Sequence, residues 1–109
     1  MDLHKLQQQL RQFASNRDWE QFHSPKNLSM ALSVEVAELL ENFQWLTEAE
    51  SASLDSNKRE DVAAEIADIQ IYLIMLADKL DVDIDTAVNA KIEFNTVKYP
   101  GSAVSPGQD

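Results

Sequence analysis

The stretch VEVAELLENFQWL, residues 34–46, decides the fold because its apolar side chains have the spacing of an amphipathic helix. With about 100° of rotation per residue, Glu35 falls in the middle of the apolar side and Glu38 at its edge, whereas Glu41 lies opposite. A carboxylate among core residues is unfavourable without a partner, so packing alone does not explain Glu35. The stretch belongs to a longer predicted helix, and the apolar side of that helix consists of Leu28, Leu32, Leu39 and Phe43.

The composition predicts a small, all-α domain. The 109 residues are the length of one domain, and 44% of them are hydrophobic. Both glycines and two of the three prolines lie in the last ten residues, so the rest lacks the turn residues of a many-stranded β protein. We therefore expect a single helical domain over residues 1–99 and a disordered tail over residues 100–109.

Charge and residue usage exclude several classes of function. The formal net charge of −10 argues against binding a nucleic-acid polymer or an anionic membrane surface. The absence of cysteine excludes disulfides, zinc–thiolate sites and thiol catalysis. No apolar run of about 18 residues and no signal peptide are present, so we expect a cytoplasmic protein with no membrane partner.

Hydrophobic periodicity predicts four helices, over about residues 2–15, 25–45, 58–80 and 83–98. Asp2, Ser24 and Asp83 are suited to cap three of them, and the polar residues 47–57 form a linker. Four helices either close a four-helix bundle within one chain or form a smaller core that a second chain completes.

The third predicted helix is apolar around most of its circumference, which indicates burial on more than one side. We therefore expect a homo-oligomer with this helix near the interface. Its apolar residues include Ile66, Ile69, Ile71, Leu73, Ile74, Met75 and Leu76.

The third helix also repeats the acidic pattern of the second. Glu65 lies at the edge of its apolar stripe, and Asp68 follows one turn later, as Glu38 follows Glu35. Four carboxylates would converge if the two helices pack together. Pairs at this spacing are common on solvated helix faces, so the sequence pattern leaves both explanations open.

Gathered carboxylates must either take up protons or bind a cation. Oxygen ligands without histidine or cysteine suit Mg²⁺, with Mn²⁺ as the alternative, and an open magnesium site usually serves phosphate chemistry. A ferritin-like di-iron site would need E-x-x-H pairs, and neither His4 nor His23 has that spacing.

The last predicted helix carries Lys91, Asn95 and Lys98 at successive turns of one side. Such a row could bind phosphate oxygens, although lysines that pair with surface acids would give the same pattern.

The few aromatic residues cluster around the second helix. Trp19 and Phe22 precede it and Trp45 ends it, so they could stack on a nucleobase, with His23 bonding a base edge or a phosphate. The alternative is that they plug the ends of a bundle.

Three motifs together resemble the MazG-like all-α nucleoside triphosphate pyrophosphohydrolases. They are EVAE at residues 35–38, EIAD at 65–68 and KIEFNTVKYP at 91–100. The segments RDWEQFHSPKNL (17–28), FQWL (43–46) and IYL (71–73) are most similar to the dCTP pyrophosphatase branch and its short bacterial relatives. The resemblance covers residues 3–100.

The resemblance implies a four-helix bundle-like fold that hydrolyses the α–β phosphate bond of nucleoside triphosphates, releasing monophosphate and pyrophosphate. It implies dimers that pair into tetramers, a dCTP preference and Mg²⁺ bound by Glu35, Glu38, Glu65 and Asp68, with Glu35 the leading candidate for proton acceptor. The implied phosphate contacts are Lys91, Asn95, Lys98 and Tyr99. The implied base pocket consists of Trp19, Phe22, His23 and Trp45, with Tyr72 as a further substrate contact.

The first helix departs from close relatives along LQQQLRQF, residues 6–13, where side chains can reach the base. Leu10 and Phe13 therefore leave the base preference open between cytosine deoxynucleotides, expected first, and others such as dATP. A non-catalytic helical scaffold or partner-binding protein, and a hydrolase of another pyrophosphate compound, also remain alternatives.

Overall fold

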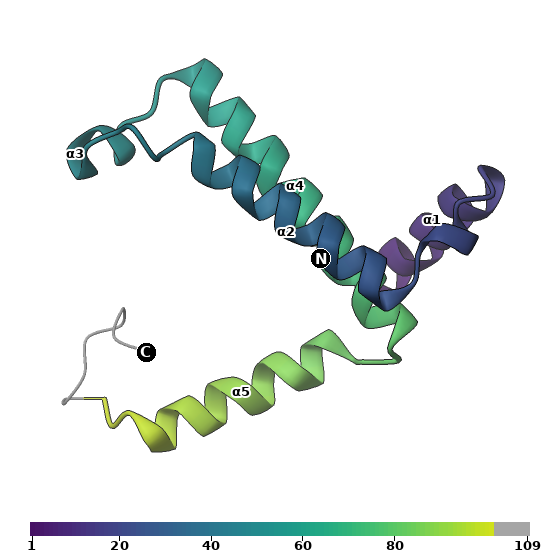
Figure 1. The fold of residues 1–109 in the computed structure, drawn as a ribbon. Coiled ribbons are helices and arrows are strands. Elements are labelled where there is room, and N and C mark those ends of the chain that lie inside the picture. The colour runs from purple at the N-terminus through teal and green to yellow at the C-terminus, as the bar shows by residue number, and fades with distance from the viewer. Residues whose placement is uncertain (102–109) are drawn as a thin grey trace.

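The computed structural model describes residues 1–101, and this range is helical without any β-strand (Figure 1). The all-α class is therefore confirmed, while most of the predicted tail, residues 102–109, lies outside the described range. None of the described helices is both long and apolar enough to cross a membrane. The elements are α1 (Leu3–Asn16), the 3₁₀ turn η1 (Glu20–Phe22), α2 (Pro25–Glu41), α3 (Glu48–Ser51), α4 (Ser56–Lys79) and α5 (Ile84–Lys98).

Each long helix begins after a side chain that caps it. Asp2, Ser24 and Asp83 accept hydrogen bonds from backbone N–H groups three residues on, as the sequence predicts. Asp55 does the same for α4, so this helix begins at Ser56, two residues earlier than predicted.

The end of the second helix and the structure of the linker differ from the sequence prediction. Helix α2 ends at Glu41 rather than near residue 45, because Phe43 N–H bonds to the Leu40 carbonyl and tightens the chain into turns. The linker is not structureless, since residues 48–51 form α3 behind a capping box between Thr47 and Glu50.

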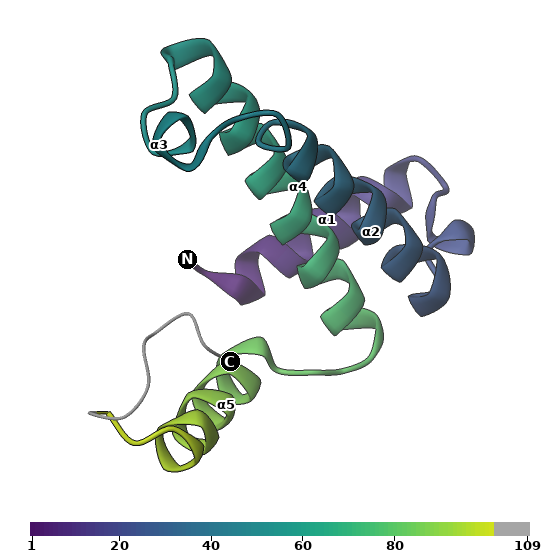
Figure 2. The ribbon, with the colours of Figure 1, turned by 60° about the vertical axis from the view of Figure 1, so that its left-hand side comes forward.

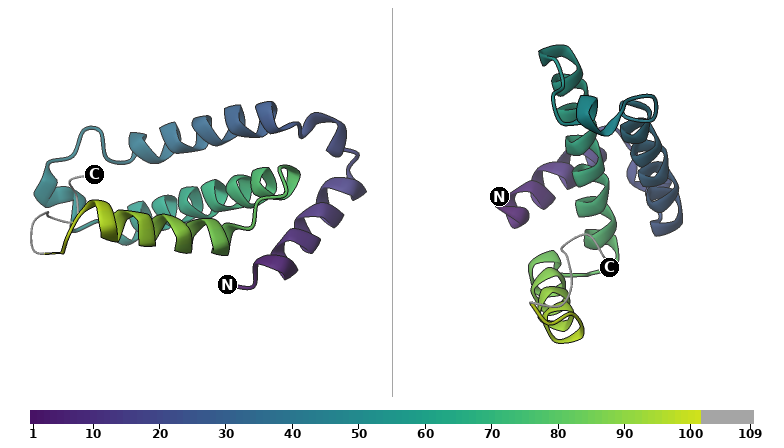
Figure 3. Two further views of the ribbon diagram at one scale, coloured as in Figure 1. Left: turned by 90° about the horizontal axis from the view of Figure 1, so that it is seen from below. Right: turned by 90° about the vertical axis from the view of Figure 1, so that its left-hand side faces the viewer.

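The main packing contact joins α2 and α4, which lie side by side and run in opposite directions (Figures 1 and 3). Helix α1 packs on α4, and a two-pronged ion pair between Arg11 and Asp78 links these two helices. The core is small, and its buried side chains within residues 1–101 are Ala14, Leu28, Ile74 and Ala77.

The chain turns after the end of α4, and helix α5 runs back at an angle that leaves it apart from the α2–α4 pair (Figures 1 and 2). Its apolar side chains stay exposed: Ile92 is 59% and Val97 is 80% accessible. One chain therefore does not close a four-helix bundle by itself. The architecture is the smaller core of the two that the sequence allows, and it leaves apolar surface without a partner.

Candidate metal and nucleotide site

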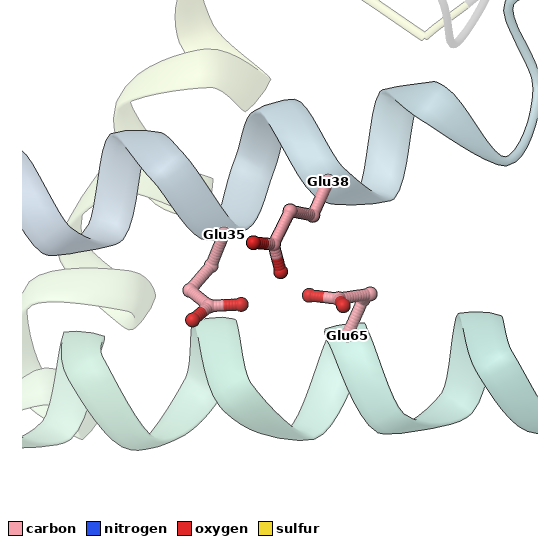
Figure 4. Close-up of side chains that lie close together, drawn as sticks. All are labelled: Glu35, Glu38 and Glu65. Atoms are coloured by element: carbon pink, nitrogen blue, oxygen red, sulfur yellow. The ribbon is translucent and has the colours of Figure 1, made fainter.

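The packing of α2 on α4 brings three of the predicted acids together. Glu35 and Glu38 project from successive turns of α2, and Glu65 projects from α4 toward them (Figure 4). One carboxylate oxygen from each lies within 4.8 Å of the other two. The sequence prediction that these acids converge across two helices is confirmed for this trio.

The cluster holds unsatisfied negative charge. Glu35 Oε2 and Glu65 Oε2 are buried and have no hydrogen-bond partner among residues 1–101. A hydrogen bond shared with Glu35, aided by burial and the charge of Glu38, raises the pKa of Glu65 to about 7. The same shared bond acts to lower the pKa of Glu35, but burial and the nearby Glu38 outweigh it, so this pKa is raised as well.

This donor set fits a divalent cation. Like charges held this close repel one another, and a hard cation replaces that repulsion with attraction. The unpartnered oxygens of Glu35 and Glu65 are the atoms that such an ion would satisfy. All three ligands are oxygen atoms, so the residues are suited to a metal of the magnesium type rather than to zinc.

Asp68, the fourth predicted ligand, borders the cluster rather than joining the close trio. It lies one turn after Glu65 on α4, and its charge contributes to the raised pKa of Glu35. Asp68 and Glu35 both line a neighbouring cavity of about 390 Å³, so Asp68 lies where the acidic cluster opens into this cavity.

The cavity has an aromatic wall. Trp19, His23 and Tyr72, all predicted substrate contacts, line it together with Glu35 and Asp68. Its remaining walls are the apolar side chains of Leu10, Phe13, Ile71 and Met75. Ile71 and Met75 could be read from the sequence only as core residues, because their helix is apolar on nearly every side.

The aromatic residues support one another. The Trp19 ring meets Phe13 edge-on, with 5.5 Å between ring centroids, and His23 with 6.4 Å. The Arg17 guanidinium lies 3.5 Å from the centroid of the Phe13 ring and donates to the Phe13 carbonyl. The end of α1 and the following turn therefore form one aromatic surface facing the acids.

Several predicted site residues are not brought to this cavity within one chain. Phe22 and Trp45 are 60% and 87% exposed, and neither lines it. Lys91, Asn95, Lys98 and Tyr99 belong to α5 and its end, away from the α2–α4 pair. The ammonium of Lys91 lies over its neighbour Phe94, and that of Lys98 over Tyr99. The roles of these residues stay predictions.

Over residues 1–101, fold and site together define an all-helical protein with an acidic cluster suited to a divalent cation beside an aromatic cavity. The chain belongs to the MazG-like family, whose sequence profile matches residues 30–104. This match contains both acidic pairs, from Glu35 to Asp68, and the whole of α5.

Known proteins support this placement. Human dCTP pyrophosphatase 1 is 46% identical over 91 residues, which cover 82% of this chain and 54% of that protein. The rat protein of the same name is 44% identical over 91 residues, which again cover 82% of this chain and 54% of that protein. The chain thus spans about half the length of these relatives. The crystal structure of a pyrophosphatase from Archaeoglobus fulgidus matches with a TM-score of 0.86 at 40% identity, covering 92% of this chain and 94% of that one.

Proposed function

We propose that this chain is a nucleoside triphosphate pyrophosphohydrolase. It cleaves the bond between the α and β phosphates of deoxynucleoside triphosphates, prefers dCTP, and releases the monophosphate and pyrophosphate. The observation that supports the proposal is the acidic trio beside a cavity with an aromatic wall, because metal–phosphate binding and base binding need groups of these two kinds next to each other. The names of the human and archaeal relatives point to the same chemistry.

The metal in this proposal is Mg²⁺, with Mn²⁺ as the alternative, bound by Glu35, Glu38, Glu65 and Asp68. When bound, the cation polarises the phosphates and lowers the pKa of a water molecule. Glu35 belongs to the acidic cluster and also lines the cavity, so in this proposal Glu35 accepts the proton of the attacking water. The aromatic faces of Trp19 and His23 hold the base, and Tyr72 offers a hydroxyl donor.

Oligomer formation is part of the proposal. The exposed apolar side chains of α5, such as Ile92, support packing against a second copy, in a dimer or a dimer of dimers. In this assembly α5 brings its polar residues to the phosphates of a bound nucleotide, and the exposed aromatic residues Phe22 and Trp45 complete a base pocket. The α5 residues assigned to the phosphates are Lys91, Asn95, Lys98 and Tyr99.

Product analysis tests the proposed reaction. The purified protein is incubated with each of the four deoxynucleoside triphosphates and Mg²⁺, and the products are separated. We expect pyrophosphate and dCMP from dCTP. Release of orthophosphate would contradict cleavage between the α and β phosphates, and no turnover of any nucleotide would favour a non-catalytic helical scaffold.

A further inference from the structure

A second cavity, of about 340 Å³, adjoins the aromatic cavity. Leu10, His23 and Met75 line both cavities, so these three side chains form the wall between them. Leu10 comes from α1 and Met75 from α4, and both are half-buried. The wall therefore includes side chains from two helices, α1 and α4.

The two cavities differ in chemistry. The far side of the wall carries polar groups, including Gln7, Glu20 and Asp78. Gln7 lies one turn before Leu10 on α1, and Asp78 lies one turn after Met75 on α4. The amide of Gln7 can both donate and accept hydrogen bonds, as the edge of a nucleobase requires. The space behind the wall therefore offers hydrogen-bonding groups to a polar ring that would reach it past Leu10 and Met75.

The wall is held in place by the ion pair beside it. Arg11 follows Leu10 directly in the chain, and its guanidinium binds both carboxylate oxygens of Asp78, with 2.7 Å between Nε and Oδ2. This geometry fixes α1 relative to α4 one turn from the wall. The ion pair therefore links α1 to α4 directly beside Leu10 and one turn from Met75.

We infer that Leu10 and Met75 limit the size of the base that the aromatic cavity accepts, by closing it from the polar cavity behind them. This inference rests on the proposed function. A single pyrimidine ring stays on the near side of the wall, whereas the second ring of a purine collides with it. A steric limit of this kind discriminates against the larger substrate without any direct contact to its polar groups.

The test opens the wall from each side separately. Leu10→Ala and Met75→Ala are compared with wild type for kcat/KM on dATP and dCTP, followed by pyrophosphate release. We expect each variant to raise the dATP/dCTP ratio by about tenfold, the lower end of what a changed apolar pocket achieves. Leu6→Ala is the matched control, because it makes the same truncation on the same helix and lines neither cavity.

The outcomes separate this inference from the proposed function. If wild type hydrolyses dCTP but neither wall variant shifts the ratio, the size limit is wrong and the function stands. A wild type that already hydrolyses dATP as well as dCTP also overturns the limit. If wild type hydrolyses no nucleotide, the proposed function fails first and the inference falls with it. Circular dichroism verifies folding, and Leu10→Val and Met75→Val replace a variant that does not fold.

Discussion

The α2–α4 pair and α5 show how similar sequence signals can lead to different environments. Both regions carry polar residues beside an apolar stripe, namely the acids of α2 and α4 and the lysines of α5. In the pair, the apolar stripes of α2 and α4 pack against each other, and this packing brings three of the acids together. On α5, the stripe stays exposed and its polar residues meet no acid of the cluster. A polar residue beside an apolar stripe therefore becomes part of a site only when that stripe has a packing partner.

The largest expected effect comes from removing a member of the acidic trio. Glu38→Gln keeps the size of the side chain but loses its charge, so it should lower the rate of pyrophosphate release by more than about 100-fold, beyond the loss typical of a residue that only supports a metal ligand. The helical circular dichroism spectrum should not change, because Glu38 is not part of the core.

Glu41→Gln is the matched control for this substitution, since Glu41 lies on the same helix but outside the cluster. It should retain wild-type activity. Equal activity in the two variants would remove Glu38 from the site.

A second prediction asks whether α5 reaches the phosphates in the assembled protein. Lys91→Ala and Lys98→Ala should each reduce kcat/KM for dCTP by about tenfold, as expected for the loss of one charge-assisted contact. Lys58→Ala, in the first turn of α4 and far from α5 in sequence, should have no effect. If all three variants match wild type, α5 plays no part in substrate binding. The α2–α4 pair would then contribute to the site and α5 would not.

The third prediction concerns whether α5 packs against a second copy of the chain. Ile92→Asp should shift the protein toward smaller species in light scattering, because a charge on the exposed stripe must be desolvated at an interface. Glu93→Gln, on the neighbouring position, should leave the oligomeric state unchanged. A wild-type protein that is monomeric at low micromolar concentration would refute the oligomer.

The smallest effect concerns stability and pH in the absence of metal. The pKa of Glu65 is raised from 4.5 to about 7, so between these values the folded state binds more protons than the unfolded state. The free energy of unfolding therefore decreases as pH rises through this window and has lost the contribution above it. We expect a lower melting temperature at pH 8 than at pH 5, with a smaller difference in Glu65→Gln.

Adding Mg²⁺ should reverse this trend, since the ion binds the ionised carboxylates and stabilises the folded state by mass action. The increase in melting temperature should be larger at pH 8 than at pH 5. An equal increase at both values would indicate that the metal binds elsewhere on this acidic chain.

Local signals account for much of what the sequence predicted correctly. Asp2, Ser24 and Asp83 cap helices because their short side chains reach backbone N–H groups nearby, and this depends only on neighbouring residues. The convergence of Glu35 with Glu65 was predictable once the two most apolar helices were assumed to pack. The short helix α3 was missed because four residues are too few to show periodicity.

Long-range packing decided the rest. The exposure of Trp45 and the separate position of α5 depend on where each helix ends and which surface it then meets, and periodicity does not contain that information. The wall formed by Leu10 and Met75 is a further case, since it joins residues of α1 and α4 that are far apart in the chain.

By itself, the sequence determined the helical class, the caps and the placement of acids beside apolar stripes, because these follow from the geometry of a single helix. Only the tertiary structure decided that three acids form a close cluster while Asp68 borders it, and that the cluster adjoins an aromatic cavity. The physical reason is that such distances depend on how helices cross, and crossing is set by the packing of side chains from several segments at once.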